Sequence, residues 1–177
     1  AGAGTGLNWA DAVTVVQAAI YTAQSAVSGD PGLDHCHVWI KAGTYNPTEG
    51  SAEAATFLMR PTVRIYGGFA DDAEAWGDRD WTAHASVLDG NGVRHVVTGA
   101  DDAVLDGVTV TGGNATDDFS DAGNRGGGMH LDGVSPTVSN CLFSGNDAPG
   151  VGAGTAGLGG ALYLTNGAAP VLSGCTF

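Results

Sequence analysis

Short segments in which alternate residues are apolar recur along the second half of the chain. Three of them begin near residues 103, 136 and 170 and can be aligned. Three aligned columns are apolar or hold cysteine: Leu105, Val138 and Leu172; Val108, Cys141 and Cys175; Val110, Phe143 and Phe177. Alternation with a period of two is typical of a β-strand with one buried face, and three to five residues are too few for a helix. The pattern therefore predicts short strands that repeat in register.

A fourth column predicts a corner between two of these strands. It contains Gly107, Asn140 and Gly174. Glycine and asparagine adopt a left-handed backbone at low cost, and a sharp bend requires that conformation. A further strand is expected from the segments that begin at Gly126 and Gly159. Three short strands per turn, stacked in parallel at about 4.8 Å, would form a parallel β-helix, which belongs to the all-β class.

The same longer unit occurs twice between residues 126 and 177. Gly127 and Gly160 are 33 residues apart, whereas Phe143 and Phe177 are 34 apart. The tetrapeptides Gly-Gly-Ala-Leu at 159 and Phe-Ser-Gly-Asn at 143 resemble the repeat of the polymorphic outer membrane proteins. The resemblance covers about residues 100 to 177. It implies a right-handed parallel β-helix on a bacterial surface.

The start of the chain predicts an amphipathic helix. Asn8 is a suitable N-cap with Asp11 three residues later, and apolar residues follow at helical spacing until Gly29-Asp-Pro-Gly32 ends the segment. Because the first turn of a solenoid exposes apolar side chains and unpaired backbone groups, we expect this helix to cover that end. A helix that binds a partner is the alternative. The expected division is a capping segment at 1–34 and a β-helix at 35–177, with the β-helix truncated at its C-terminal end.

A second resemblance concerns residues 7 to 70. The opening helix is followed by Val-Trp-Ile-x-x-Gly-Thr-Tyr from Val38 and by Val-x-Ile-Tyr-Gly-Gly-Phe from Val63. This combination resembles the N-terminal part of secreted bacterial β-helix repeat proteins. It implies that the chain includes the true start of such a domain and that the protein is secreted or lies on a cell surface.

Composition narrows the possible partners. The 177 residues carry a net charge of −13 and only six Lys and Arg residues, which disfavours nucleic acid and anionic membrane surfaces. No run of about 18 apolar residues is present, so we expect no transmembrane segment in this chain. Asp outnumbers Glu by 16 to 3, which suits a turn-rich fold and also suits calcium.

The three cysteines do not form an even disulfide set. Cys141 and Cys175 share an inward column, and we expect them to be buried thiols that act as small apolar groups. A disulfide between directly stacked strands is a possible but awkward alternative. Cys36 lies between His35 and His37, but neighbours on a strand point to opposite faces, which argues against a metal site there.

Calcium is the only cofactor that the sequence suggests. Asp117, Asp118 and Asp121 could present three carboxylates within one insertion, although their spacing matches no known calcium loop. The alternative is a solvated acidic loop.

Catalysis and ligand binding give further candidates. His130, Asp132, Arg94 and the pair Asp101 and Asp102 could take part in polysaccharide cleavage. His130 aligns with Tyr163 on the outward face, where an exposed ring column could bind a sugar by stacking. However, no acidic pair recurs in adjacent turns, and an acidic chain suits a polyuronate substrate badly.

We therefore expect a non-catalytic extracellular β-helix module for adhesion, structural display or assembly. Its partner would be a surface glycan, a surface protein or further copies of itself. The alternative is a carbohydrate-active β-helix, either a polysaccharide lyase or a glycoside hydrolase.

Overall fold

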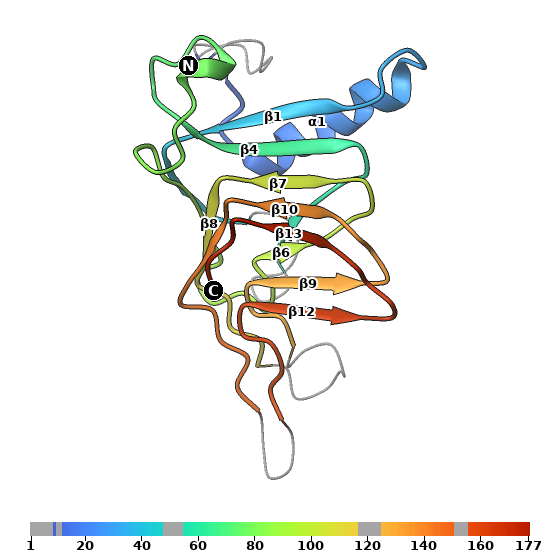
Figure 1. Ribbon diagram of the computed structural model, residues 1–177, viewed down its shortest axis with the longest axis vertical. Coiled ribbons are helices and arrows are strands. Elements are labelled where there is room, and N and C mark those ends of the chain that lie inside the picture. The colour runs from blue at the N-terminus through green and yellow to red at the C-terminus, as the bar shows by residue number, and fades with distance from the viewer. Residues whose placement is uncertain (1–8, 10–11, 48–54, 117–124, 151–155) are drawn as a thin grey trace.

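The computed structural model describes residues 9, 12–47, 55–116, 125–150 and 156–177. Within these residues the chain forms one α-helix and three parallel β-sheets (Figure 1). Consecutive strands along the chain belong to the three sheets in turn. Each strand therefore pairs with the strand three places later in the chain, which is the equivalent strand of the next repeat. This arrangement is consistent with the parallel β-solenoid that the repeats predict.

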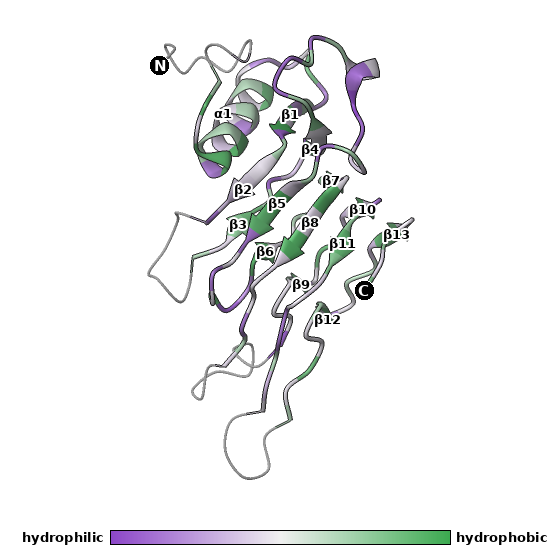
Figure 2. Cartoon of the chain, turned by 90° about the vertical axis from the view of Figure 1, so that its left-hand side faces the viewer, coloured by the Kyte–Doolittle hydropathy of each residue, from purple (hydrophilic) through white to green (hydrophobic). Residues whose placement is uncertain are grey.

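The strands are short, as the alternation predicts. The five-stranded sheet contains, in order, β1 (Cys36–Lys41), β4 (Val63–Phe69), β7 (Val104–Asp106), β10 (Thr137–Ser139) and β13 (Val171–Ser173). The second sheet contains β11 (Leu142–Phe143), β8 (Val108–Thr111), β5 (Ser86–Asp89) and β2 (Gly43–Tyr45). The third contains β12 (Leu162–Thr165), β9 (Met129–Asp132), β6 (Val97–Thr98) and β3 (Phe57–Leu58). Figure 2 shows the strands of the second sheet side by side, with α1 at the end where β1 and β2 lie.

The predicted columns are confirmed by the strand register. Leu105, Val138 and Leu172 are paired across β7, β10 and β13, and Val110 is paired with Phe143. The predicted corner residues have positive φ angles of 67°, 52° and 62° at Gly107, Asn140 and Gly174. Like residues therefore lie over like residues, and the turns between them use the left-handed backbone.

The core follows from this register except at its last layer, where Leu172, predicted to be buried, is 42% exposed. Leu105, Val138, Val110 and Phe143 are each at most 2% exposed. The ring of Phe177 stacks on that of Phe143 with centroids 5.2 Å apart, but Phe177 is 61% exposed. The prediction that Phe177 lies inside is wrong, because its ring is covered on the Phe143 side only.

The helix α1 (Val16–Gly29) begins later than predicted. Its N-cap is Val15, whereas Asn8 and Asp11 lie outside the described residues. The start predicted near Trp9 is wrong, because Trp9 is held by tertiary contacts. Its indole Nε1 donates to the carbonyl oxygen of Ala73, and its ring lies 6.0 Å from that of Phe69.

Gln17 links α1 to the outermost strand of the third sheet. Its side chain is fully buried, its Nε2 donates to the carbonyl oxygen of Leu58 at 3.1 Å, and its Oε1 accepts from the amide of Leu58 at 2.8 Å. The side-chain amide thus bonds both backbone groups of one residue in β3, as a neighbouring strand would. Val16, Ile20 and Ala23 of the same helix belong to the apolar core.

Candidate functional site

The outer face of the five-stranded sheet gathers aromatic, basic and polar side chains. In β1 and β4 the apolar residues point inward, so His37, Trp39, Arg64 and Tyr66 point outward. The register pairs His37 with Arg64 and Trp39 with Tyr66. The next strands continue these two columns with Val104 and Asp106 in β7 and with Thr137 and Ser139 in β10. Large rings thus lie over β1 and β4, and smaller side chains, three of them polar, follow on β7 and β10.

The loop between β4 and β5 adds indole rings to this face. A short 3₁₀ turn at Trp76–Asp78 holds Trp76, and Trp81 follows it. Gly68 has a φ of 95°, and a Cβ there would lie 2.6 Å from the backbone of Trp81. Glycine is therefore required for the loop to fold back onto the sheet.

Arg79 anchors that loop to the sheet. Its guanidinium pairs with the carboxylate of Asp106, its Nε donates to the carbonyl oxygen of Gly67 at 2.6 Å, and both charged side chains are nearly buried. Asp106 also accepts hydrogen bonds from Ser139 and Asn140. The planar guanidinium lies 5.4 Å from the ring centroid of Trp76 and 4.8 Å from that of Trp81. One buried ion pair thus fixes the position of both indoles.

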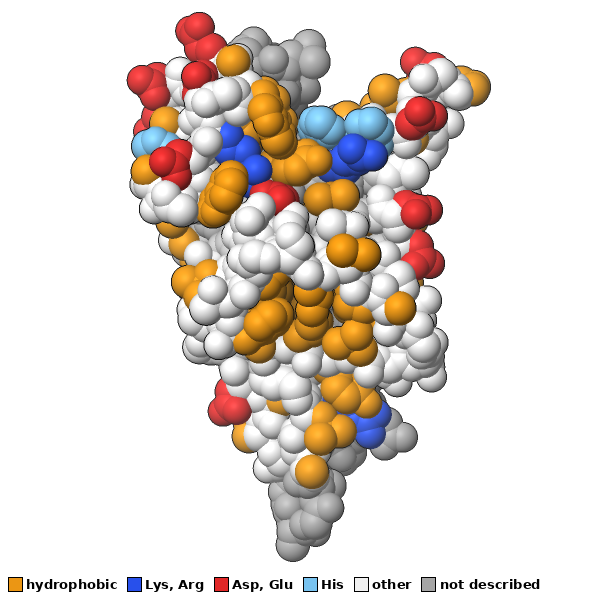
Figure 3. All heavy atoms as spheres, viewed as in Figure 1, with side chains coloured by type: hydrophobic (Ala, Val, Ile, Leu, Met, Phe, Trp, Pro, Cys, Tyr) orange, Lys and Arg blue, Asp and Glu red, His pale blue; other side chains and the backbone are white. Residues whose placement is uncertain are grey.

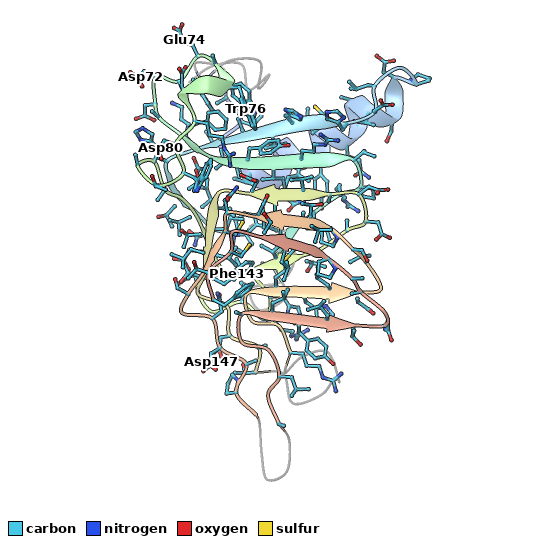
Figure 4. The ribbon with its side chains drawn as sticks, in the orientation of Figure 1. Asp72, Glu74, Trp76, Asp80, Phe143 and Asp147 are labelled. Carbon is cyan, nitrogen blue, oxygen red and sulfur yellow. The ribbon has the colours of Figure 1, made fainter. Side chains whose placement is uncertain are left out.

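Four rings form a connected cluster, which we call the aromatic face: His35, His37, Tyr66 and Trp76. His35 and His37 stack with centroids 5.1 Å apart, and His37 meets the edge of Tyr66 at 5.1 Å. Tyr66 meets Trp76 edge-on at 4.7 Å. Trp76 is 46% exposed, and Figure 4 shows its side chain beside β1. In Figure 3, histidine and basic side chains gather with apolar side chains over the same end of the sheet.

A polar cavity of about 430 Å³ continues from the aromatic face. It is lined by Asp34, His35, Arg64, Asp102, Ser135 and Thr137, among others. His35 and Arg64 therefore border both the aromatic face and the cavity. A ligand on this surface would meet apolar rings at one end and hydrogen-bonding groups of both charges at the other.

The electrostatics of the aromatic face disfavour an additional positive charge. The pKa of His37 is lowered, first by partial burial among the neighbouring rings and then by His35 and Arg64. His37 is therefore neutral at pH 7, and its imidazole can both donate and accept a hydrogen bond.

The predicted pair of His130 and Tyr163 is brought together on a different sheet. The two residues are paired across β9 and β12, and their rings stack at 5.8 Å. His130 also stacks on His95 at 4.8 Å, and Arg125 lies over Tyr163. Because these neighbours cover it, His130 is only 9% exposed, so the prediction of an exposed histidine is wrong.

Burial has electrostatic consequences in this stack. The pKa of His95 falls to about 4, first because of burial. The pKa of His130 is also lowered, with burial as the largest cause. Both imidazoles are neutral at pH 7, and this ring stack packs side chains between successive repeats.

Of the proposed catalytic residues, Asp132 lies near His130, whereas Asp101 and Asp102 are held elsewhere. Asp101 accepts a hydrogen bond from the amide of Ser135 at 2.7 Å, and Asp132 accepts one from the side chain of Asn166. Asp102 instead lines the polar cavity. Arg94 precedes β6 and is partly buried. The structure thus uses Asp101 and Asp132 in hydrogen bonds between successive repeats and brings Asp102 to the five-stranded sheet.

Two sets of residues in the sequence are candidate metal ligands. Asp117, Asp118 and Asp121 lie outside the described residues. Within the described part of the chain, no three His, Cys, Asp or Glu side chains are grouped closely enough to hold a metal ion, and this includes His35, Cys36 and His37.

The aromatic face was not predicted from the sequence. A usable signal was present, because His37 and Tyr66 occupy outward positions of two strands whose inward residues are apolar. The contribution of Trp76 and Arg79 depends on how the loop folds back, which no local pattern specifies.

Comparison with known proteins gives no match to the chain among family models, curated proteins or solved structures. Among the described residues, no helix is long and apolar enough to cross a membrane.

Proposed function

We propose that the chain is a right-handed parallel β-helix whose first turn is capped by α1. The right-handed sense is the usual one for connections between parallel strands of one sheet. The cap is supported by the two hydrogen bonds between Gln17 and Leu58 and by the burial of Val16, Ile20 and Ala23 against the core. In this proposal residues 1–34 form the capping segment and residues 35–177 form the β-helix.

We further propose that the protein is a non-catalytic adhesion or display module, secreted or held on a bacterial surface, that binds a glycan on the aromatic face. The observation that carries this proposal is the exposed indole of Trp76, held beside Tyr66 and His37 by a buried ion pair. Sugar rings present apolar C–H faces that stack on aromatic side chains, while their hydroxyl groups need polar partners. The adjoining cavity supplies such partners from Asp34, Arg64 and Thr137.

A neutral glycan fits this surface better than a strongly anionic one. The chain has a net charge of −13, so a polyanion would be repelled before it reached the site. Arg79, the cation nearest the indoles, is already neutralised by Asp106. A protein partner or a second copy of the chain would need a larger complementary surface than these rings provide.

A glycan array probed with the purified protein tests this proposal. Wild-type protein should bind a subset of neutral oligosaccharides, and Trp76→Ala should abolish that binding. Leu142→Ala is a matched control, because Leu142 is an exposed apolar residue of the second sheet. Equal loss in both variants, or unchanged binding by Trp76→Ala, would refute a site on the aromatic face.

One observation favours the alternative of a carbohydrate-active β-helix. Asp34 and Asp102 line the same cavity beside His35, and glycoside hydrolysis commonly uses two carboxyl groups. A reducing-sugar assay on each bound oligosaccharide would separate the two functions. Turnover that Asp102→Asn abolishes would establish the enzyme and overturn the non-catalytic proposal.

A further inference from the structure

Cys141 and Cys175 occupy equivalent positions in successive repeats. The residues on either side are directly linked: the amide of Asn140 donates to Ser173, and the amide of Thr176 donates to the carbonyl oxygen of Cys141 at 2.9 Å. Leu142 and Thr176 form a parallel bridge. The two cysteines therefore lie one above the other, with a separation of about 4.8 Å between their strands.

The two side chains also point the same way. The thiol of Cys141 lies 3.6 Å from the carbonyl oxygen of Leu105, and that of Cys175 lies 3.5 Å from the equivalent oxygen of Val138. Both thiols are free, and Cys175 packs against the core that includes Cys141. Disulfides join cysteines whose Cα atoms are roughly 4.4–6.8 Å apart, so bond formation requires only rotation and a small approach of the side chains.

The chemistry of the two thiols differs. The pKa of Cys175 is lowered to about 6, mainly by its interaction with Cys141. The same interaction raises the pKa of Cys141, and burial raises it further. Cys175 is also the more accessible of the two, since Cys141 is only 2% exposed. Cys175 is therefore suited to act as the attacking thiolate, and Cys141 as the thiol that reacts second.

We propose that Cys141 and Cys175 are a redox-active pair that forms a disulfide by exchange with a low-molecular-weight disulfide. In the first step the Cys175 thiolate attacks one sulfur of that disulfide, forms a mixed disulfide and releases one thiolate. In the second step Cys141 loses its proton, its sulfur attacks Cys175 in the mixed disulfide, and the second small thiol leaves. The pair is oxidised by two electrons, which reduce the small disulfide to two thiols. The product joins two successive repeats covalently.

Oxidised glutathione is a suitable probe, with thiol titration and intact mass as readouts. The native wild-type protein should fall from three titratable thiols to one and lose two hydrogens without retaining glutathione. Cys141→Ser should retain one glutathione on Cys175, because the second step is blocked. Cys175→Ser should keep both of its thiols, since the thiol of Cys141 is buried and out of reach of the small disulfide.

Cys36→Ser is the matched control, because Cys36 lies in β1, remote from the pair in sequence and in strand order. It should lose both of its thiols. A melting curve for each variant checks that the fold is kept, and the oxidised wild-type protein should melt at a higher temperature than the reduced protein. Three remaining thiols in the wild-type protein, stable glutathione on Cys175 despite Cys141, or disulfide-linked dimers would each overturn the proposal.

Discussion

Replacing Gln17 by leucine tests the contact between α1 and the outermost strand of the third sheet. The change keeps the side chain similar in size but makes it apolar, so that both hydrogen bonds to Leu58 are lost. Each bond contributes about 1 kcal/mol net, and a buried backbone group left without a partner costs roughly 1–3 kcal/mol. Because Gln17 is fully buried, water cannot replace its amide. We expect the free energy of unfolding to fall by about 2–4 kcal/mol.

Urea unfolding followed by tryptophan fluorescence measures this loss. Gln24→Leu is the matched control, since Gln24 lies in the same helix but outside the buried set. It should change stability by no more than about 0.5 kcal/mol. The denaturant slope should stay constant, so that the shift of the midpoint reports stability alone. A Gln17→Leu protein as stable as the control would refute the claim that this amide completes the edge of β3.

Four further substitutions test other parts of the structure by the same unfolding assay. Arg79→Ala leaves the nearly buried carboxylate of Asp106 without its cation, so the free energy of unfolding should fall by about 3–5 kcal/mol. A loss below about 1 kcal/mol would contradict the buried ion pair. The stability of the wild-type protein should fall as the pH drops from 6.5 towards 4, because the unfolded chain binds a proton at His95 that the folded chain binds only near pH 4. After allowance for partial solvent exposure, this loss of stability amounts to about 1–2 kcal/mol. His95→Gln should flatten the dependence of stability on pH between about 6.5 and 4. An unchanged pH dependence in this variant would argue against burial of His95 as the cause. Phe143→Ala should cost about 3–5 kcal/mol and Phe177→Ala about 1 kcal/mol or less, since only the first ring is buried; equal costs would contradict the described core.

The repeats predicted the strand register well, for a physical reason. In a stacked parallel fold each residue lies over the equivalent residue of the next repeat, so the type of side chain in one repeat indicates the type expected directly above and below it. Leu105, Val138 and the left-handed corner at Asn140 could therefore be assigned from the alignment alone.

Predictions failed where contacts between distant segments decide the outcome. The capping signal at Asn8 placed the start of the helix too early, because Trp9 bonds to Ala73 and packs on Phe69. His130 was expected to be exposed, but its neighbour His95 belongs to no aligned column of the repeat. Local patterns give the direction of a side chain but not what covers it.

The aromatic face, too, could be predicted only in part from local sequence patterns. The outward rings of β1 and β4 can be read from alternation, whereas the position of Trp76 depends on the pair between Arg79 and Asp106, 27 residues apart. The loop carries no periodicity, and only the folded chain shows which strand it covers.

The most direct test of the account is the response of the four tryptophan indole N–H signals in an NMR titration. An oligosaccharide identified by the array is added to uniformly ¹⁵N-labelled wild-type protein. We predict that the signal of Trp76 shifts with ligand concentration, because its exposed indole belongs to the aromatic face. The signal of Trp9, whose N–H is bonded to Ala73, should stay in place. Saturable binding that leaves the Trp76 signal unmoved would contradict a glycan site on the aromatic face.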